Sequence, residues 1–254
     1  MYRENTLKRR LRDGETCYGA FLGLADPAVA EIVANAGFDC VLIDHEHGPG
    51  TLADGAALLR AVQTTPCTAL IRVPWNDAVY VKRILDLGME GVMFPAVSSA
   101  EEARAAVSAC RYPPEGTRGC AAGIVRASRF GMEKDYIRDA NANLLVICQI
   151  ETLEGVEAIP DIARVPGVDM LFVGPFDLSG SIGRLGQFDR PEVRELLMRA
   201  ERAILDSGCL YGTMPNPVRP VAELRDAGCR LIVPGSDVML LREAALALTA
   251  SLKG

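Results

Sequence analysis

Short apolar runs rich in Val, Ile and Leu recur along the chain and alternate with longer amphipathic stretches. Runs of this length are typical of strands buried on both faces, and apolar residues three and four apart indicate helices. The predicted strands span residues 18–22, 39–44, 68–73, 91–96, 144–151, 168–174, 209–214 and 231–235. Predicted helices between them include Pro27–Asn35, Leu52–Gln63, Asp77–Leu87, Ala100–Cys110, Pro191–Ser207 and Arg219–Ala227.

Glycine and proline mark the ends of these elements. Gly37, Gly88, Gly208 and Gly228 each follow a predicted helix, where glycine readily forms a left-handed cap. Pro191 begins a helix, where its missing N–H is harmless. Eight strand–helix units in 254 residues predict one (β/α)8 TIM barrel domain over residues 1–254, with a doubly wound open sheet as the alternative.

One segment departs from this alternation. Residues Arg111–Asn143 begin with a stretch too rich in Gly and Pro for a barrel helix. We expect an extended excursion there, and loops of such length in compact domains are often functional.

Composition limits the partners and the compartment. The net charge of −6 argues against nucleic acid as the main partner, and the charged N-terminus and absence of a long apolar run argue against secretion and membranes. The eight cysteines form no Cys-x-x-Cys pair, so we expect reduced, mostly buried thiols in a cytoplasmic protein rather than disulfides or structural zinc.

Carboxylates follow two predicted neighbouring strands. Glu151 ends the fifth, and Asp177 comes just after the Gly174-Pro175 break that ends the sixth. Because parallel strands of a barrel end at one rim, these like charges would repel each other there. A divalent cation bound through oxygen would relieve the repulsion, although each carboxylate could instead cap a helix.

The only two histidines, His45 and His47, lie at another strand end beside Asp44. In an extended segment their side chains would point the same way, so they could ligate a metal together or divide into one base and one packing residue. The next strand ends at Arg72, which needs either a substrate anion or a salt bridge to Asp44 or Glu46. Asp86 is placed near a helix C-terminus, which indicates a specific partner.

Five segments together resemble the HpcH/HpaI aldolases, the metal-dependent (class II) pyruvate aldolases. They are Leu42-Ile-Asp-His-Glu-His-Gly-Pro, Arg72-Val-Pro, Tyr112-Pro-Pro-Glu-Gly-Thr-Arg-Gly, Gln149-Ile-Glu-Thr and Phe172-Val-Gly-Pro-Phe-Asp-Leu-Ser. The resemblance implies a barrel of the phosphoenolpyruvate/pyruvate type. It also implies reversible cleavage of a 4-hydroxy-2-oxo acid to pyruvate, or hydroxypyruvate, and an aldehyde. A trimer or hexamer of identical chains is implied as well.

The resemblance also implies roles for individual residues. Glu151 and Asp177 would bind Mg2+, Mn2+ or Co2+, with Zn2+ as a further candidate and no organic cofactor. The substrate would contact Gln149, Arg72 and the backbone N–H groups of Gly174, Phe176 and Asp177. His47 matches the acid/base histidine, Asp86 a carboxylate that reaches it from a neighbouring subunit, and Asp44 a polar residue of the site.

Two positions differ from the family pattern. His45 stands where that pattern has Gly or another residue, and Phe176 is bulkier than the small residue often found there, so it could narrow the acceptor pocket. No lysine lies at a strand end as a Schiff-base candidate, which leaves a metal as the electron sink. The alternatives are a citrate-lyase-β-like acyl-CoA lyase and a non-catalytic barrel that binds a keto acid.

Overall fold

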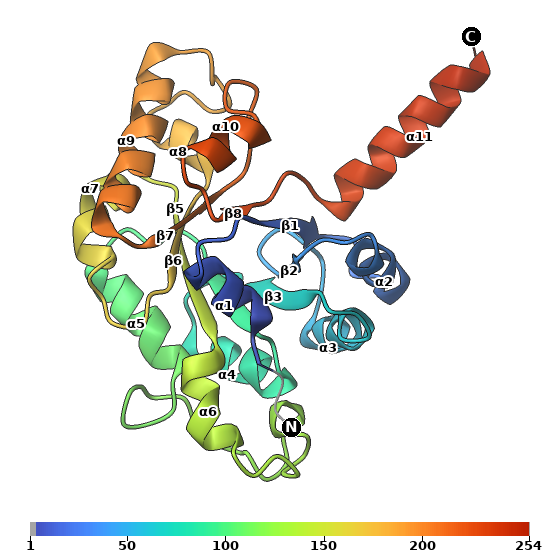
Figure 1. Cartoon of the computed structure of the whole chain (residues 1–254), viewed down its shortest axis with the longest axis vertical. Helices are drawn as coiled ribbons and strands as arrows, with labels where there is room; N and C mark the ends of the chain where they lie inside the picture. The colour runs from blue at the N-terminus through green and yellow to red at the C-terminus, as the bar shows by residue number, and fades with distance from the viewer. Residues whose placement is uncertain (1–3, 254) are drawn as a thin grey trace.

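Eight parallel strands close into a barrel in the computed structural model, which describes residues 4–253 (Figure 1). The strands pair in chain order, and β8 closes the barrel against β1. They are β1 (Cys17–Leu22), β2 (Cys40–Asp44), β3 (Thr68–Arg72), β4 (Gly91–Phe94), β5 (Leu145–Ile150), β6 (Met170–Val173), β7 (Leu210–Thr213) and β8 (Leu231–Ile232). The predicted barrel is therefore confirmed, and the open-sheet alternative is wrong.

Helices surround this barrel (Figure 1). They are α1 (Thr6–Arg12), α2 (Pro27–Asn35), α3 (Leu52–Val62), α4 (Ala78–Leu87), α5 (Ala100–Cys110), α6 (Tyr136–Asn143), α7 (Leu153–Ile162), α8 (Pro175–Ser181), α9 (Pro191–Ser207), α10 (Val221–Asp226) and α11 (Asp237–Lys253). All four glycines expected to cap helices have positive φ, between 76° and 102°. The excursion after α5 is not wholly extended, because it contains α6 and one short 3-10 turn.

The apolar residues of each strand divide between two cores. Leu42 and Leu70 point into the barrel, whereas their neighbours Val41, Ile43 and Ile71 pack outward against the helices. This alternation places every residue of β2 and β3 in the interior. It explains why the strands read as continuous apolar runs, since neither face meets water.

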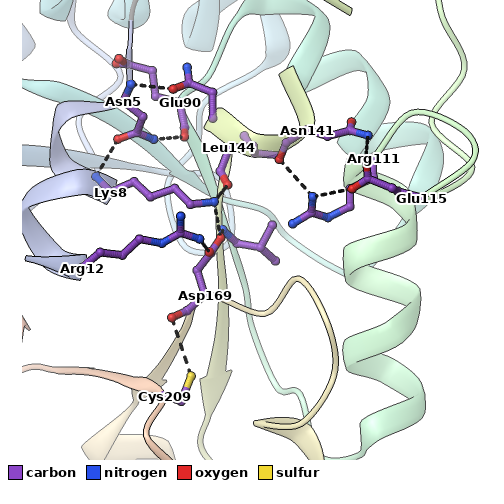
Figure 2. A network of polar contacts seen from close by, with 12 residues as sticks. Asn5, Lys8, Arg12, Glu90, Arg111, Glu115, Asn141, Leu144, Asp169 and Cys209 are labelled. Atoms are coloured by element: carbon purple, nitrogen blue, oxygen red, sulfur yellow. Dashed lines mark hydrogen bonds and ion pairs between the residues drawn. The ribbon is translucent and has the colours of Figure 1, made fainter. Parts of the chain in front are cut away.

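The N-terminal helix α1 connects three strand starts at the end of the barrel opposite the strand C-termini (Figure 2). Lys8 is buried there, and its Nζ donates to the carbonyl of Leu144 at 2.6 Å and to Asp169 Oδ2 at 2.9 Å. Asp169 also accepts from Arg12 at 2.9 Å, and Asn5 donates to the carbonyl of Glu90 at 2.6 Å. A buried charge needs such partners, so α1 is fixed in place.

The C-terminal helix α11 leaves the barrel after β8 and projects away from it (Figure 1). Within residues 237–253, Asp237 is the only buried residue, and it accepts hydrogen bonds from the N–H groups of Gly23 and Leu24. The helix exposes large apolar side chains, namely Val238, Leu240, Leu241, Leu246, Leu248 and Leu252. Water does not stabilise such a surface, which is typical of an interaction site.

The cysteines are free thiols, as predicted. Six are buried, Cys209 is partly buried, and Cys120 is exposed. Burial raises the pKa of Cys110 and Cys229 to about 12, which keeps these thiols protonated and unreactive. Among residues 4–253, no helix is both long enough and apolar enough to cross a bilayer.

Candidate active site

Charged side chains converge where β2, β3 and β5 end. Asp44 is the last residue of β2, Arg72 is its direct partner at the end of β3, and Glu151 follows β5. All three are at least nine-tenths buried, so each must be matched by a polar partner. The strand ends thus bring together charged residues that the sequence placed at one rim.

Arg72 is bound by two carboxylates. Its Nε and Nη2 donate to the two oxygens of Asp44 at 3.0 and 2.7 Å, and Nη1 lies 2.9 Å from Glu46 Oε2. Burial acts to raise the pKa of Asp44, but the hydrogen bonds and charge of Arg72 outweigh it and hold that pKa below its usual value. Of the two kinds of partner expected for Arg72, the protein carboxylates are therefore present.

Glu151 is fixed at both carboxylate oxygens. Oε1 accepts from the N–H of Ala96 at 2.7 Å, and Oε2 accepts from Gln149 Nε2 at 2.6 Å. Burial raises the pKa of Glu151 to about 7; the Ala96 hydrogen bond opposes this, while the charges of Glu46 and Asp177 add to it. Neighbouring carboxylates thus destabilise each other's charged forms.

Close packing around Glu151 explains two backbone features that the sequence did not reveal. A Cβ on Gly174 would lie 2.7 Å from Glu151 Oε2 and 2.9 Å from Gln149 Nε2, so only glycine fits. Ala96 has φ of 52°, a left-handed conformation that is uncommon without glycine. This conformation accompanies an N–H directed at Glu151, and strain of this kind concentrates at functional sites.

Asp177 lies in the first turn of α8 and is exposed, rather than at a simple strand end. Fewer backbone N–H groups of residues 174–177 are therefore available to bind a carboxylate than predicted. The N–H of Gly174 donates to the carbonyl of Ile150 at 3.1 Å, and Pro175 has no N–H. The predicted contact from the Gly174 amide is therefore wrong, and Phe176 and Asp177 retain the free N–H groups of a helix start.

The two histidines point in different directions, so the prediction that they share one face is wrong. Residues 45–48 form a bend instead of continuing β2. The ring of His45 is buried, and its Nδ1 lies 2.6 Å from the Tyr80 hydroxyl. The side chain of His47 is 67% exposed, and its Nε2 lies 3.8 Å from Glu46 Oε2. His47 alone is accessible to a substrate.

Asp86 lies near the C-terminal end of α4, at the opposite end of the barrel from the site of the same chain. It has the specific partner that its position predicted, because Arg118 Nη2 donates to it at 2.9 Å. Arg118 also lies over the ring of Tyr112 in the excursion. Within one chain, Asp86 and His47 are not brought together.

Phe176 is half exposed on α8, and its ring meets Phe188 edge to face at a centroid distance of 5.0 Å. Phe176 directly precedes Asp177 in the first turn of α8. Narrowing of the acceptor pocket by this ring stays a prediction.

The donors present fit a divalent cation in an open site. The charges of Glu46 and Asp177 raise the pKa of Glu151, and a cation would remove that penalty. Gln149 Oε1 is buried with no hydrogen-bond partner, which leaves an acceptor for a further group. In the described part of the chain, no cluster of three or more His, Cys, Asp or Glu residues could hold a metal. Water and substrate oxygens would therefore have to complete the coordination.

Known proteins that resemble this chain in sequence include aldolases. The HpcH/HpaI aldolase/citrate lyase family matches residues 17–244. A hydroxypyruvate/pyruvate aldolase of Delftia acidovorans is 41% identical over 96% of this chain and 90% of its own length. A 4-hydroxy-2-oxovalerate aldolase of Novosphingobium aromaticivorans is 44% identical over 92% and 88%. A crystal structure of a family protein from Burkholderia cenocepacia is 40% identical, with a TM-score of 0.94 over 98% of this chain and all of that one.

The barrel and these relatives define the class of the protein, a carbon–carbon lyase that carries out aldol cleavage. The chain belongs to the HpcH/HpaI aldolase/citrate lyase family. The family resemblance inferred from the five sequence motifs is confirmed, and the reading of the chain as a non-catalytic binding barrel is wrong.

Proposed function

We propose that this aldolase reversibly cleaves a 4-hydroxy-2-oxo acid to pyruvate or hydroxypyruvate and an aldehyde, and that it requires a divalent cation. The relatives named as hydroxypyruvate/pyruvate aldolase and 4-hydroxy-2-oxovalerate aldolase support this substrate class. The observation that carries the proposal is Glu151, buried with both oxygens held and its pKa raised to about 7. A carboxylate so placed is stabilised as an anion by a bound cation.

Glu151 and Asp177 would hold the cation, with Mg2+, Mn2+ and Co2+ as the first candidates and Zn2+ as a further one. When bound, the cation acts as a Lewis acid that stabilises the negative charge of the pyruvate enolate. Gln149 positions Glu151 through its amide and offers its unpaired Oε1 to the substrate side. The amides of Phe176 and Asp177 at the start of α8 would take the substrate carboxylate.

Arg72 binds the keto oxygen that becomes the enolate. Its guanidinium is already oriented by Asp44 and Glu46, and its burial excludes the water that would weaken its field. Glu46 shares Arg72 through one Nη only, so substrate oxygen could replace that contact without disturbing the bidentate pair with Asp44. Asp44 thus positions Arg72 rather than meeting the substrate.

His47 transfers the proton. In the cleavage direction it takes the proton of the C4 hydroxyl, the bond between C3 and C4 breaks, and the aldehyde leaves. The enolate is then protonated at C3 to give pyruvate. The exposed imidazole of His47 lies 3.8 Å from Glu46 Oε2 and is accessible to a bound substrate.

The site is completed by a second copy of the chain in a trimer or hexamer. Asp86 lies too far from His47 of its own chain but is partly exposed, so it could reach His47 of a neighbour. The exposed leucines of α11 support association, since an unpaired apolar helix is unfavourable in water. Two inactive variants, His47→Ala and Asp86→Asn, should restore each other on mixing and reassembly, with about a quarter of sites intact.

Metal removal tests the main proposal. The wild-type enzyme is dialysed against EDTA, assayed for aldol cleavage and for oxaloacetate decarboxylation, and then supplied with Mn2+, Co2+, Mg2+ or Zn2+. We expect both activities to disappear and to return with metal. Full activity after exhaustive chelation would refute the metal assignment.

The acyl-CoA lyase alternative is tested in the same preparation, because the family description covers citrate lyases as well. Pyruvate formed from a hydroxy-oxo acid without coenzyme A identifies the aldolase. Turnover of an acyl-CoA ester, with no turnover of free keto acids, would instead identify the alternative.

A further inference from the structure

His45 and Tyr80 make a contact that the proposed chemistry does not use. His45 Nδ1 lies 2.6 Å from the Tyr80 hydroxyl, and the two rings meet edge to face. The imidazole is nearly inaccessible to solvent. It is also one of only two in the chain, and the other is the proposed acid/base residue.

The surroundings of His45 are shaped to fit its ring. A Cβ on Gly50 would lie 3.0 Å from Nε2, and a Cβ on Gly55 would lie 3.1 Å from Cε1, so larger residues would press on the imidazole. Gly55 lies within α3, where glycine is a poor helix former, and its packing against His45 gives a reason for it. The ring occupies a fitted recess rather than filling space by chance.

The contact joins the two segments that carry the polar rim. His45 begins the bend of residues 45–48, and its N–H donates to the carbonyl of Arg72 at 2.9 Å. Tyr80 lies in the first turn of α4, directly after β3, and its N–H is held by the helix cap Asp77 at 2.7 Å. The side-chain contact therefore fixes the loop after β2 to the helix after β3.

The bend is also held by the ion pair between Arg72 Nη1 and Glu46 Oε2 at 2.9 Å, and its other polar contacts are longer. The N–H groups of Glu46 and His47 donate to Asp44 Oδ1, but at 3.1 and 3.3 Å, and the same oxygen also binds Arg72. The His47 side chain itself is mostly exposed. The hydrogen bond between the buried His45 ring and the partly buried Tyr80 hydroxyl next to this bend therefore contributes to where Glu46 and His47 lie.

We infer that His45 and Tyr80 are positioning residues that act together as a latch, holding the 45–48 bend so that His47 and Glu46 face the substrate. The latch acts on proton transfer and leaves binding of the keto acid to other residues. This inference rests on the proposed role of His47 in aldol cleavage.

Tyr80→Phe tests the latch because it removes only the hydroxyl. We expect kcat to fall about 10-fold, since small misplacements of a catalytic group have large effects, while KM for the keto acid stays within about twofold. A purely structural role would lower the melting temperature and leave kcat unchanged at a temperature where the protein is folded. Tyr18→Phe removes a hydroxyl near the opposite end of the barrel and serves as the matched control.

Substitutions of His45 separate hydrogen bonding from packing. His45→Asn keeps an acceptor near the position of Nδ1 and should retain more activity than His45→Leu, which fills the recess without accepting a hydrogen bond. Equal losses of kcat in the two variants would overturn the latch. So would a kcat of Tyr80→Phe within twofold of wild type.

Chemical modification gives a readout independent of activity. Diethyl pyrocarbonate acylates accessible neutral imidazoles, and peptide mass spectrometry assigns the product to His45 or His47. Wild-type protein should be modified at His47 and protected at His45, and Tyr80→Phe should become reactive at His45. Continued protection of His45 in Tyr80→Phe would show that Tyr80 is not the latch. If the wild-type enzyme has no aldolase activity, the proposed function fails, whereas the labelling result still decides whether the contact holds the bend.

Discussion

Replacing Glu151 with Gln should stabilise the metal-free protein and abolish its activity. The pKa of Glu151 rises from its ordinary value of 4.5 to about 7 in the folded chain. At about 1.4 kcal/mol per pKa unit, the charged carboxylate therefore lowers the stability of the metal-free fold by about 3 kcal/mol above pH 7. The folded pKa is the higher one, so this loss develops as the pH rises from about 4.5 to about 7.

The amide of the Glu151→Gln variant has no such penalty, but it has one acceptor oxygen where the carboxylate has two. Ala96 and Gln149 both donate to Glu151, so one of these contacts must change. Gln149 can rotate its amide and present Oε1, which has no partner in the described residues. Allowing about 1 kcal/mol for imperfect replacement, we expect a net gain of about 2 kcal/mol at pH 8.

Urea unfolding in EDTA measures this difference for both proteins at pH 5 and pH 8. The Gln variant should exceed wild type at pH 8 and lose most of that advantage at pH 5, where Glu151 is protonated in the folded state. Adding Mn2+ should reverse the order at pH 8, since the cation stabilises only the protein that binds it. A variant less stable than wild type at pH 8 in EDTA would refute the argument from burial and charge repulsion.

Other substitutions test separate parts of the site. Arg72→Lys should lower kcat by about 10²-fold or more, because an ammonium cannot replace the planar fork, and near-normal steady-state kinetics would exclude Arg72 as the enolate partner. His47→Ala should lower kcat by roughly 10²–10⁴ with an unchanged circular dichroism spectrum; a loss this large in His45→Ala, but not in His47→Ala, would exchange their roles. Phe176→Ala should improve kcat/KM for bulky aldehydes relative to acetaldehyde, and an unchanged ranking across an aldehyde panel would exclude the ring from the acceptor pocket. Gly174→Ala should displace the Glu151 carboxylate, so titration with Mn2+ should show a lower affinity of the protein for this ion.

The barrel was predictable because its strands are buried on both faces and several of its helices end at glycines. Both features can be recognised from a few neighbouring residues of the sequence. The carboxylates and Arg72 were found for the same reason, since they stop apolar runs. The positions of Asp44 and Arg72 at strand ends were also enough to predict that the two residues lie close together. Their hydrogen bonds depend on register between neighbouring strands, which the closed barrel fixes.

Features that depend on backbone direction were not predictable. The bend after Asp44 turns His45 and His47 apart, whereas alternation along a strand would keep them together. Ala96 adopts a left-handed conformation that alanine usually avoids, so the residue type gives no indication of it. Asp177 falls within α8 because Pro175 begins a helix at once, and the apolar run before it gives no indication of this.

The contacts of the N-terminal helix α1 can form only after a much later part of the chain has been synthesised. Lys8 leaves the ribosome early, but its carboxylate partner Asp169 follows 161 residues later, and Leu144 follows 136 residues later. The buried ammonium therefore has no partner until most of the chain has been synthesised, and α1 cannot take its final place before Asp169, which precedes β6, has emerged. Such distant contacts slow folding, so the nascent chain should remain open to chaperones and proteases at least until its sixth strand emerges.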